Sequence, residues 1–215
     1  GYISARSLKL PGSETVFLDA NECAFEPFVG ASGLSRYPAQ QPAQLVDAFC
    51  RWLDVSSCNL TITRGADEAI DCLMRAFCIP AVDNVVTCPP TFAMYAQSAM
   101  LQGVAVRSAM LDSNFGLDLA AIEKAVDANT KMIFVCSPNN PTANIMDAGA
   151  IQKLCETYGD RALIIVDETY IEFSDQPSSI AKLDQFANLV VLRTLSKSHA
   201  AAGLRCGAAV ARGDV

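Results

Sequence analysis

The sequence predicts an α/β fold, with three α/β/α layers around a mostly parallel central sheet, on two observations. From about residue 60 onward, apolar runs of strand length alternate with segments whose apolar residues have helical spacing, which is the pattern of βαβ units. In addition, the runs MIFVC and LIIV are apolar at every position. Such runs are typical of central strands that are buried on both faces of a sheet.

The elements follow from these patterns in chain order. The apolar runs predict strands at residues 84–88, 104–109, 131–136, 162–167, 189–193 and 206–211. The segments with helical spacing predict helices near residues 66–79, 92–102, 118–127 and 147–158. Each helix candidate lies between two strand candidates or directly precedes the first of them, as expected for crossover connections between parallel strands.

The first 40 residues differ from the rest because Gly and Pro interrupt short apolar pieces. We therefore expect residues 1–40 to form an N-terminal arm, with substrate and dimer contacts, that lies over another part of the protein. Residues 41–215 are expected to form one large domain. Since the chain stops at ARGDV directly after a strand candidate, we expect this domain to be incomplete at its C-terminal end.

Composition and charge favour a small-molecule ligand. The chain is 51% hydrophobic and 18% charged, so it can bury a substantial core. Its net charge of −7 and its lack of a Lys/Arg cluster argue against nucleic acid or an anionic membrane as a partner. No apolar run approaches the ~20 residues of a membrane span, and no signal-peptide pattern opens the chain. We therefore expect a cytoplasmic protein.

The cysteines do not predict a metal site. There are nine of them with one histidine, and they are scattered, odd in number and without a C-x-x-C pair. We interpret most of them as small apolar core residues that stay reduced, rather than as disulfide-forming or catalytic residues. No bound metal is expected.

Polar residues follow three of the strand candidates, in the segments SPNNPTAN, DETYIEF and TLSKSHAAAGLR. Because ligands of open α/β sheets bind at the carboxyl ends of the strands, we expect Asn140, Asp167, Tyr170, Lys197 and Arg205 to lie in one region. Each of these residues has an ordinary explanation by itself, as a turn residue, a cap or a surface charge. Those explanations do not account for the presence of all five residues in one region.

A further polar feature is the predicted helix start in TRGADEAIDCL. Gly65 and Ala66 lie at this start, with Asp67 and Glu68 in the first helical turn. The first N–H groups of a helix lack intrahelical acceptors, so they can hold an anion such as phosphate. Taken alone, the segment is better explained as an ordinary glycine turn before an acidic helix start, and only the neighbouring polar groups favour a phosphate site.

Together these groups match the chemical needs of pyridoxal phosphate. Its aldehyde requires a lysine for a Schiff base, its pyridine nitrogen requires a carboxylate, and its phosphate requires an anion site. Phe92, in PPTFAMY, supplies an aromatic face for the ring. A dinucleotide is disfavoured because no G-x-G-x-x-G follows a strand candidate.

The chain resembles the fold-type I, class II aminotransferases that depend on pyridoxal phosphate, and within them the histidinol-phosphate aminotransferases. The resemblance covers essentially the whole chain and rests on the motifs LDANE, RYP, RGADEAID, CPPTFAMY, VCSPNNPT, VDETYIEF and RTLSKSHAAAGLRCG. It implies the large domain of the pyridoxal phosphate-dependent transferase fold, pyridoxal 5'-phosphate as cofactor, and a homodimer. The implied reaction of L-histidine biosynthesis transfers the amino group of L-histidinol phosphate to 2-oxoglutarate and gives L-glutamate.

The resemblance also implies a role for each matching residue. Lys197 would bind the cofactor covalently and then move a proton, and Asp167 would pair with the ring nitrogen. Asn140 and Tyr170 would hydrogen-bond the ring hydroxyl, and Phe92 would stack on the ring. The cofactor phosphate would be held by Ala66, Asp67, Thr194, Ser196 and Arg205.

Three N-terminal residues are expected to contribute from outside the predicted sheet. The tyrosine of RYP, Tyr37, would reach the phosphate in the site of the partner subunit. Tyr2 and Asn21 resemble positions that line the substrate pocket. These assignments rest on the resemblance alone.

The sequence departs from the family pattern at several points. Ala143 stands where glycine is usual, Asp19 where asparagine is more common, and NECAFEP replaces the usual NENP. His199 stands where an apolar or aromatic residue is typical, and we interpret it as a local variation rather than a catalyst. Family members continue into a C-terminal domain with an arginine for the glutamate carboxylate, which these 215 residues lack.

Three other functions stay open at this stage. The first is an aminotransferase for aromatic or other amino acids, and the second is an enzyme similar to threonine-phosphate decarboxylase. The third is an α/β module that binds the cofactor without transamination, either as an inactive truncated domain or as a degraded remnant.

Overall fold

One sheet of seven strands organises the computed structural model of the chain, which describes residues 23, 25, 27–30, 35 and 41–213. The order of the strands across the sheet is β1-β7-β6-β5-β4-β2-β3. Their bounds are Leu60–Thr63 (β1), Asn84–Thr87 (β2), Ala105–Ser108 (β3), Thr130–Cys136 (β4), Leu163–Asp167 (β5), Leu189–Thr194 (β6) and Gly207–Ala211 (β7).

Parallel pairing joins β3, β2, β4, β5 and β6, whereas β7 is antiparallel to both of its neighbours, β6 and β1. In the central register, Cys136 of β4 pairs with Asp167 of β5, so both strands end at the same level. The carboxyl ends of β1 to β6 and the beginning of β7 therefore meet at one edge of the sheet. The predicted mostly parallel sheet is confirmed.

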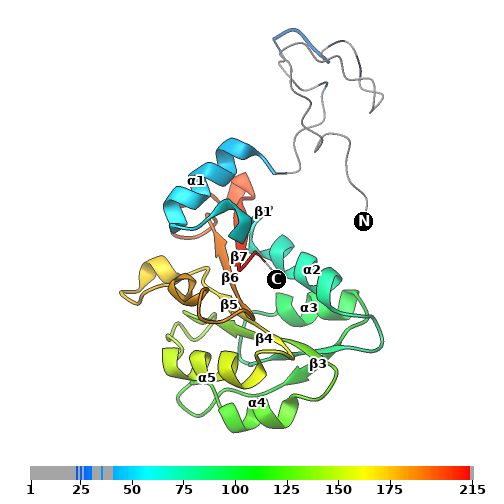
Figure 1. Cartoon of the computed structure of the whole chain (residues 1–215), viewed down its shortest axis with the longest axis vertical. Helices are drawn as coiled ribbons and strands as arrows, with labels where there is room; N and C mark the ends of the chain where they lie inside the picture. Colours follow the sequence, from blue (N-terminus) through cyan, green and yellow to red (C-terminus); the bar gives the residue numbers. More distant parts are fainter. Residues whose placement is uncertain (1–22, 24, 26, 31–34, 36–40, 214–215) are drawn as a thin grey trace.

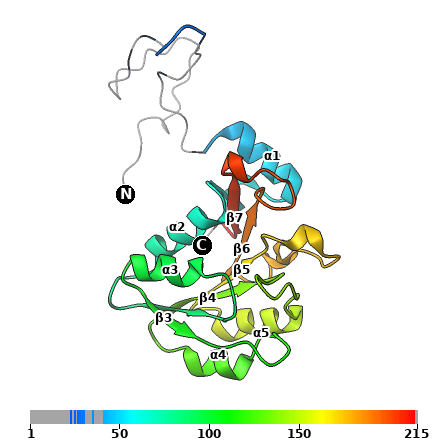
Figure 2. The same cartoon turned by 180° about the vertical axis from the view of Figure 1, so that it is seen from behind.

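Helices cover both faces of this sheet (Figures 1 and 2). The α2 and α3 helices lie on one face, and α4 and α5 lie on the other. Their bounds are Ala43–Leu53 (α1), Ala66–Phe77 (α2), Met94–Leu101 (α3), Leu119–Ala125 (α4) and Ala148–Tyr158 (α5). Short 3-10 helices occupy Ser57–Asn59 (η2), Ile171–Phe173 (η3), Ser179–Lys182 (η4) and Ala202–Leu204 (η5). Among the described helices, none is long and apolar enough to cross a membrane.

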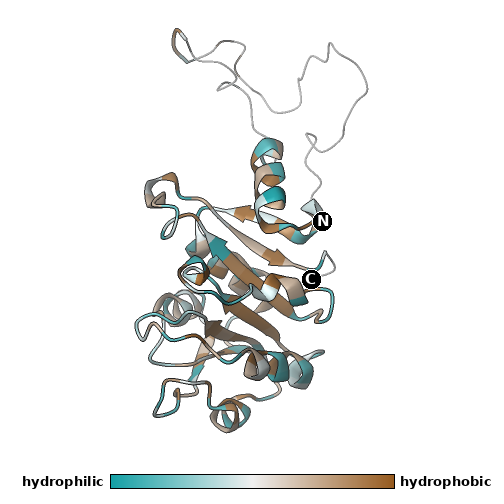
Figure 3. Ribbon diagram, turned by 90° about the vertical axis from the view of Figure 1, so that its left-hand side faces the viewer, coloured by the Kyte–Doolittle hydropathy of each residue, from teal (hydrophilic) through white to brown (hydrophobic). Residues whose placement is uncertain are grey.

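The core consists of two apolar clusters, one on each face of the sheet. Alternate residues of β4 enter different clusters: Phe134 packs with the α2 and α3 cluster, and Ile133 and Val135 pack with the cluster of α1, α4 and α5. This alternation follows from the period of two residues in a strand. Figure 3 shows the apolar strands between the more polar outer helices. Burial of β4 and β5 on both faces confirms that they are central strands.

Side-chain caps explain where two of the helices begin. Asp118 accepts a hydrogen bond from the Ala121 N–H at the start of α4, at 3.0 Å. Asp147 does the same for the Ala150 N–H at the start of α5, at 2.7 Å. Each carboxylate satisfies an N–H group that has no acceptor within the helix.

The sequence-based elements agree with the structure except at two places. All predicted strands and helices are present, with ends displaced by at most two residues. The α1 helix and the β1 strand were missing from the prediction. Their signals were available: Leu45, Phe49 and Leu53 recur at helical spacing, and Leu60 and Ile62 alternate with threonine. The four-residue length of β1 makes its alternation a weak signal.

The prediction that most of the cysteines are core residues is confirmed. Cys78, Cys88, Cys136, Cys155 and Cys206 are buried, and Cys50 is half-buried. The thiols of Cys23, Cys58 and Cys72 are exposed instead, so these three are not core residues. All nine are free cysteines.

Candidate active site

A cavity of about 170 Å³ lies at the sheet edge where β4, β5 and β6 end. It brings together every described residue that the sequence analysis placed in the site: Ala66, Asp67, Phe92, Asn140, Asp167, Tyr170, Thr194, Ser196, Lys197 and Arg205. Cys136, Thr169 and Ala202 line it as well and were not predicted. Tyr2, Asn21 and Tyr37 lie outside the described residues, so their assignments stay predictions.

Asp167 is the buried acidic group of the cavity and the last residue of β5. Its side chain is buried, with an exposed fraction of 2%. One carboxylate oxygen accepts hydrogen bonds from the Thr169 N–H at 3.0 Å and the Thr169 hydroxyl at 2.6 Å. The other accepts from the Tyr95 hydroxyl at 2.7 Å. Burial raises the pKa of Asp167, and these hydrogen bonds act against that rise. A cation bound here would relieve the cost of burying the carboxylate.

Tyr95 is the main site residue that sequence reasoning missed. It lies in α3, is fully buried, and stacks on Phe134 with ring centres 4.8 Å apart. Its ring also meets Phe92 edge to face at 5.6 Å. Burial, together with the nearby negative charge of Asp167, raises the pKa of the Tyr95 phenol. The hydroxyl therefore stays protonated and acts as the hydrogen-bond donor to Asp167. The signal in PPTFAMY was its pair of aromatic residues: Phe92 lies just before α3 and Tyr95 lies in its first turn.

The α2 helix start and Arg205 form one corner of the cavity, called the anion corner below. Arg205 donates from Nη2 to the Arg64 carbonyl at 3.2 Å and lies 3.7 Å from the Asp67 carboxylate. The first N–H groups of α2 have no acceptor within the helix. The guanidinium and these N–H groups together suit an anion such as phosphate.

Two glycines allow this corner to form. Gly65 has φ +88°, and a Cβ there would lie 3.0 Å from the Arg205 guanidinium. A Cβ on Gly207 would lie 2.7 Å from the Arg193 carbonyl oxygen and 2.8 Å from the Gly65 carbonyl carbon. Because only glycine fits such close approaches, β7 can begin directly against the start of α2.

Lys197 lies in the turn that follows β6. Thr194 shapes this turn, since its hydroxyl lies 3.0 Å from the Ser196 hydroxyl and accepts from the Ser196 N–H at 3.2 Å. The Lys197 carbonyl accepts a hydrogen bond from the Ala200 N–H at 3.0 Å. The Lys197 Nζ lies 5.9 Å from the centre of the Tyr170 ring. The amine and the phenol thus share the cavity.

The loop after β4 holds Asn140 through its neighbour Asn139. Asn139 is buried, donates to the Pro90 carbonyl at 2.9 Å, and accepts from the Thr91 hydroxyl at 3.0 Å. These bonds join the loop to the segment that carries Phe92, so Asn139 has a structural role that sequence reasoning missed. Ala143 in this loop has φ +61°. The alanine therefore adopts a conformation that favours the glycine usual at this position.

His199 lies away from the cavity. Its ring meets Trp52 edge to face at 4.9 Å, and its Nδ1 lies 2.9 Å from the Ser198 hydroxyl. It does not line the cavity, which agrees with its interpretation as a local variation. Cys136 does line the cavity, but burial raises the pKa of its thiol to about 12, so it stays neutral and is a poor nucleophile.

The donor set of the cavity fits a phosphorylated aromatic aldehyde better than a metal ion. It offers an amine, a buried carboxylate, a phenol, an amide, and the anion corner of Arg205 and α2. The described part of the chain holds no group of three His, Cys, Asp or Glu side chains that could bind a metal ion. Gly65 lets the Arg205 guanidinium lie beside the α2 helix start, because a Cβ there would come within 3.0 Å of it.

Comparisons with known proteins agree with this chemistry. The family model for aminotransferase class I and II matches residues 16–215. The histidinol-phosphate aminotransferase of Aliivibrio fischeri (strain ATCC 700601 / ES114) is 44% identical over the whole chain, which covers 62% of that protein. The enzyme of the same name from Sodalis glossinidius is 43% identical, and the match covers 100% of this chain and 59% of that protein. The chain spans about three fifths of the length of these curated relatives.

The fold is also found in a solved structure. The crystal structure of the histidinol-phosphate aminotransferase from Clostridium acetobutylicum superimposes with a TM-score of 0.75 at 23% identity. The match covers 84% of this chain and 53% of that one. At this level of identity, the likeness concerns the fold alone.

Proposed function

Because this chain belongs to the family of class I and II aminotransferases, we propose that it forms the cofactor-binding part of an aminotransferase that uses pyridoxal 5'-phosphate. The observation that carries the proposal is the grouping of Lys197, the buried Asp167 and Arg205 around one cavity. An ordinary structural role explains each of these residues singly, but it does not explain an amine and a buried carboxylate that face the same space.

The residues of the cavity divide between the parts of the cofactor. Asp167 would hold the ring nitrogen, Asn140 and Tyr170 the ring hydroxyl, and Phe92 one face of the ring. The phosphate would be held by Arg205, Thr194, Ser196 and the N–H groups of Ala66 and Asp67. When bound, the cofactor supplies an aldehyde for the amino group and a protonated ring that accepts electrons from the substrate α-carbon.

The protein supplies orientation and proton transfer. Lys197 would hold the cofactor through its Nζ and, once released, take a proton from the substrate α-carbon as a general base. Asp167 would keep the ring nitrogen protonated, because its carboxylate is buried and is fixed by Thr169 and Tyr95.

The names of the relatives support a specific substrate pair. We propose L-histidinol phosphate as the amino donor and 2-oxoglutarate as the acceptor, with L-glutamate as a product, in L-histidine biosynthesis. The support is the identity of 43 to 44% to proteins named histidinol-phosphate aminotransferase. We further propose a cytoplasmic homodimer in which Tyr37 reaches the partner's cavity, and this residue lies outside the described part of the chain.

The first test is to locate the cofactor. The purified chain is incubated with pyridoxal phosphate, reduced with borohydride and digested, and the modified peptide is identified by its mass. We expect a phosphopyridoxyl group on Lys197. In the variant Lys197→Ala, the peptide that contains residue 197 should carry no such group. Modification of other lysines only, in a folded chain, would exclude the proposed site. Lys182 is a suitable control, since it lies outside the cavity, and Lys182→Ala should leave the modification of Lys197 unchanged.

The second test concerns the substrate. The chain loaded with cofactor is mixed with L-histidinol phosphate, L-phenylalanine or O-phospho-L-threonine, and the absorbance of the cofactor is followed. A change with L-histidinol phosphate alone supports the proposed donor. A faster change with either of the other two amines would assign the chain to a different aminotransferase or to a decarboxylase.

A further inference from the structure

A buried ionic network lies on the opposite side of β6 from the cavity. Thr194 lines the cavity, and the preceding residue, Arg193, projects to the other face because side chains alternate along a strand. Arg193 has an exposed fraction of only 6%. Its guanidinium forms an ion pair with Glu172, lies 3.8 Å from the Glu168 carboxylate, and lies 4.8 Å from the centre of the Trp52 ring.

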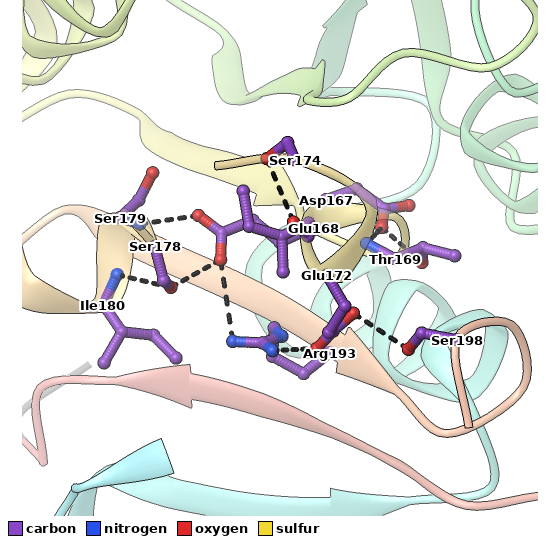
Figure 4. A network of polar contacts seen from close by, with 11 residues as sticks. Asp167, Glu168, Thr169, Glu172, Ser174, Ser178, Ser179, Ile180, Arg193 and Ser198 are labelled. Atoms are coloured by element: carbon purple, nitrogen blue, oxygen red, sulfur yellow. Dashed lines mark hydrogen bonds and ion pairs between the residues drawn. The ribbon is translucent and has the colours of Figure 1, made fainter. Parts of the chain in front are cut away.

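This network reaches the lysine turn through the Ser198 hydroxyl and also through Trp52, which lies against Arg193 and meets the His199 ring. One oxygen of Glu172 pairs with Arg193, and the other accepts a hydrogen bond from the Ser198 hydroxyl at 3.0 Å. Figure 4 shows this chain of contacts from Arg193 through Glu172 to Ser198. Ser198 directly follows Lys197 in the sequence, so the bond fixes the backbone next to the reactive amine.

The same network also holds the loop that carries Tyr170. Glu168 is buried and accepts hydrogen bonds from the Ser178 hydroxyl at 2.5 Å and the Ser179 N–H at 2.6 Å. Glu168 and Glu172 therefore anchor the chain two residues before and two residues after Tyr170. Arg193 connects both anchors, and it lies on β6, which ends at the lysine turn.

We propose that Glu172 and Ser198 are positioning residues that set the place of Lys197 relative to Tyr170 through their direct hydrogen bond, with Arg193 holding the other oxygen of Glu172. The inference deepens the proposed function and rests on it for the role of Lys197. Glu172, Arg193 and Ser198 do not line the cavity. The effect of the network reaches the site only through the position of the two loops.

Ser198→Ala is the cleanest substitution, because it cuts the bond between Glu172 and the lysine turn and leaves the Arg193–Glu172 pair intact. It also removes the contact between the Ser198 hydroxyl and the His199 Nδ1. Ser174→Ala is the matched control. The Ser174 hydroxyl donates to the Ile171 carbonyl at 3.0 Å in the same loop and has no contact with Arg193 or Ser198 in the described structure. Ser198→Thr keeps a hydroxyl and should restore the original behaviour.

The first readout needs no cofactor. Hydrogen exchange of the peptide covering residues 195–204 is measured in the cofactor-free chain for all four proteins. We expect about fivefold faster exchange in Ser198→Ala, the effect of losing one ordinary hydrogen bond, and unchanged exchange in Ser198→Thr and Ser174→Ala. Equal exchange in Ser198→Ala and the original chain would overturn the inference.

The second readout is the rate at which pyridoxal phosphate modifies Lys197, trapped with borohydride at successive times. Ser198→Ala should slow this rate several-fold while the melting temperature stays within one degree or so of the original, and Ser198→Thr should recover the rate. A rate unchanged in Ser198→Ala also contradicts the inference. Failure of the proposed function looks different: the original chain itself would then show no modification at Lys197, and the exchange measurement would still decide the role of Ser198.

Discussion

At the scale of single residues, the buried carboxylate of Asp167 is the most informative group of the protein. A folded chain that only needed stability would not place a carboxylate at 2% exposure without a cationic partner. Its hydrogen bonds come from neutral donors, Thr169 and Tyr95. The position is therefore built to receive a positive charge from a ligand, at a cost to the stability of the ligand-free chain.

This cost predicts the effect of Asp167→Asn. The amide oxygen can still accept from Thr169, and the amide N–H can donate to the Tyr95 oxygen, so the fold should survive. Because burial raises the pKa of Asp167 in the folded state, stability falls as the pH rises from the ordinary value of 3.8 through the folded-state pKa, and above that pKa the loss stays constant. The ligand-free variant should thus melt at a higher temperature than the original at pH 7.

The gain should disappear in acid, where Asp167 is protonated in both states. Thermal melts of both proteins between neutral and acidic pH measure how the difference in melting temperature changes with pH. The affinity for the cofactor should fall in the variant at neutral pH. A lower melting temperature of Asp167→Asn at pH 7 would mean that the hydrogen bonds of the carboxylate outweigh its desolvation.

Tyr95→Phe tests how the protein keeps that carboxylate charged. The substitution preserves the ring contacts with Phe92 and Phe134 but removes the hydroxyl that donates to Asp167. Since this hydrogen bond lowers the pKa of Asp167, its loss should raise that pKa further. Cofactor binding should then weaken at a higher pH than in the original chain as the solution is acidified. Titrations of cofactor absorbance against pH measure the shift, and Tyr158→Phe, outside the cavity, should leave it unchanged.

At the scale of elements, the anion corner depends on the contact between the start of β7 and the start of α2. Gly207→Ala should disrupt this contact, because the added Cβ would meet backbone atoms of Arg193 and Gly65 closer than 3.0 Å. Backbone cannot yield as a flexible side chain does, so we expect a loss of roughly 1–3 kcal/mol in the free energy of unfolding. Urea denaturation measures it.

Gly203→Ala is the matched control for this change, since an added Cβ there meets no atom within 4 Å. It should leave the unfolding free energy nearly unchanged. Gly207→Ala should also weaken the binding of inorganic phosphate, because Arg205 would be displaced from the α2 helix start. Equal stability of the two variants would show that β7 can move away from α2 without cost.

Much of the arrangement of elements, and of the site residues at their ends, was predictable from the sequence. The buried strands and the polar residues at their ends place Asn140, Asp167 and Lys197 correctly, because strand direction alone brings these positions together. The contacts of Tyr95, Asn139 and Arg193 were not predictable in the same way. Each contact joins residues from different elements that are far apart in the sequence. The residue pattern within one segment does not show which side chain of another element will lie beside it.

At the scale of the whole molecule, cofactor binding and stability should be linked. A ligand that binds only the folded chain raises its melting temperature in proportion to the logarithm of the ligand concentration. We expect pyridoxal phosphate to raise the melting temperature of the original chain, and the rise to be smaller in Arg205→Ala, which loses a contact to the phosphate. Differential scanning fluorimetry with pyridoxal as a phosphate-free control separates the contribution of the anion corner. Equal rises with pyridoxal and pyridoxal phosphate would contradict the assignment of that corner.

The reversed direction of β7 has a consequence for how the site assembles. A chain that runs out along β6 and returns along β7 passes the same place twice within a few residues, with Lys197 on the way out and Arg205 on the way back. Closing so short a loop loses little chain entropy, whereas bringing Asp167 beside Lys197 requires the pairing of strands much further apart in the sequence. The two cations should therefore meet early in folding, and the acidic partner of the site should join them later.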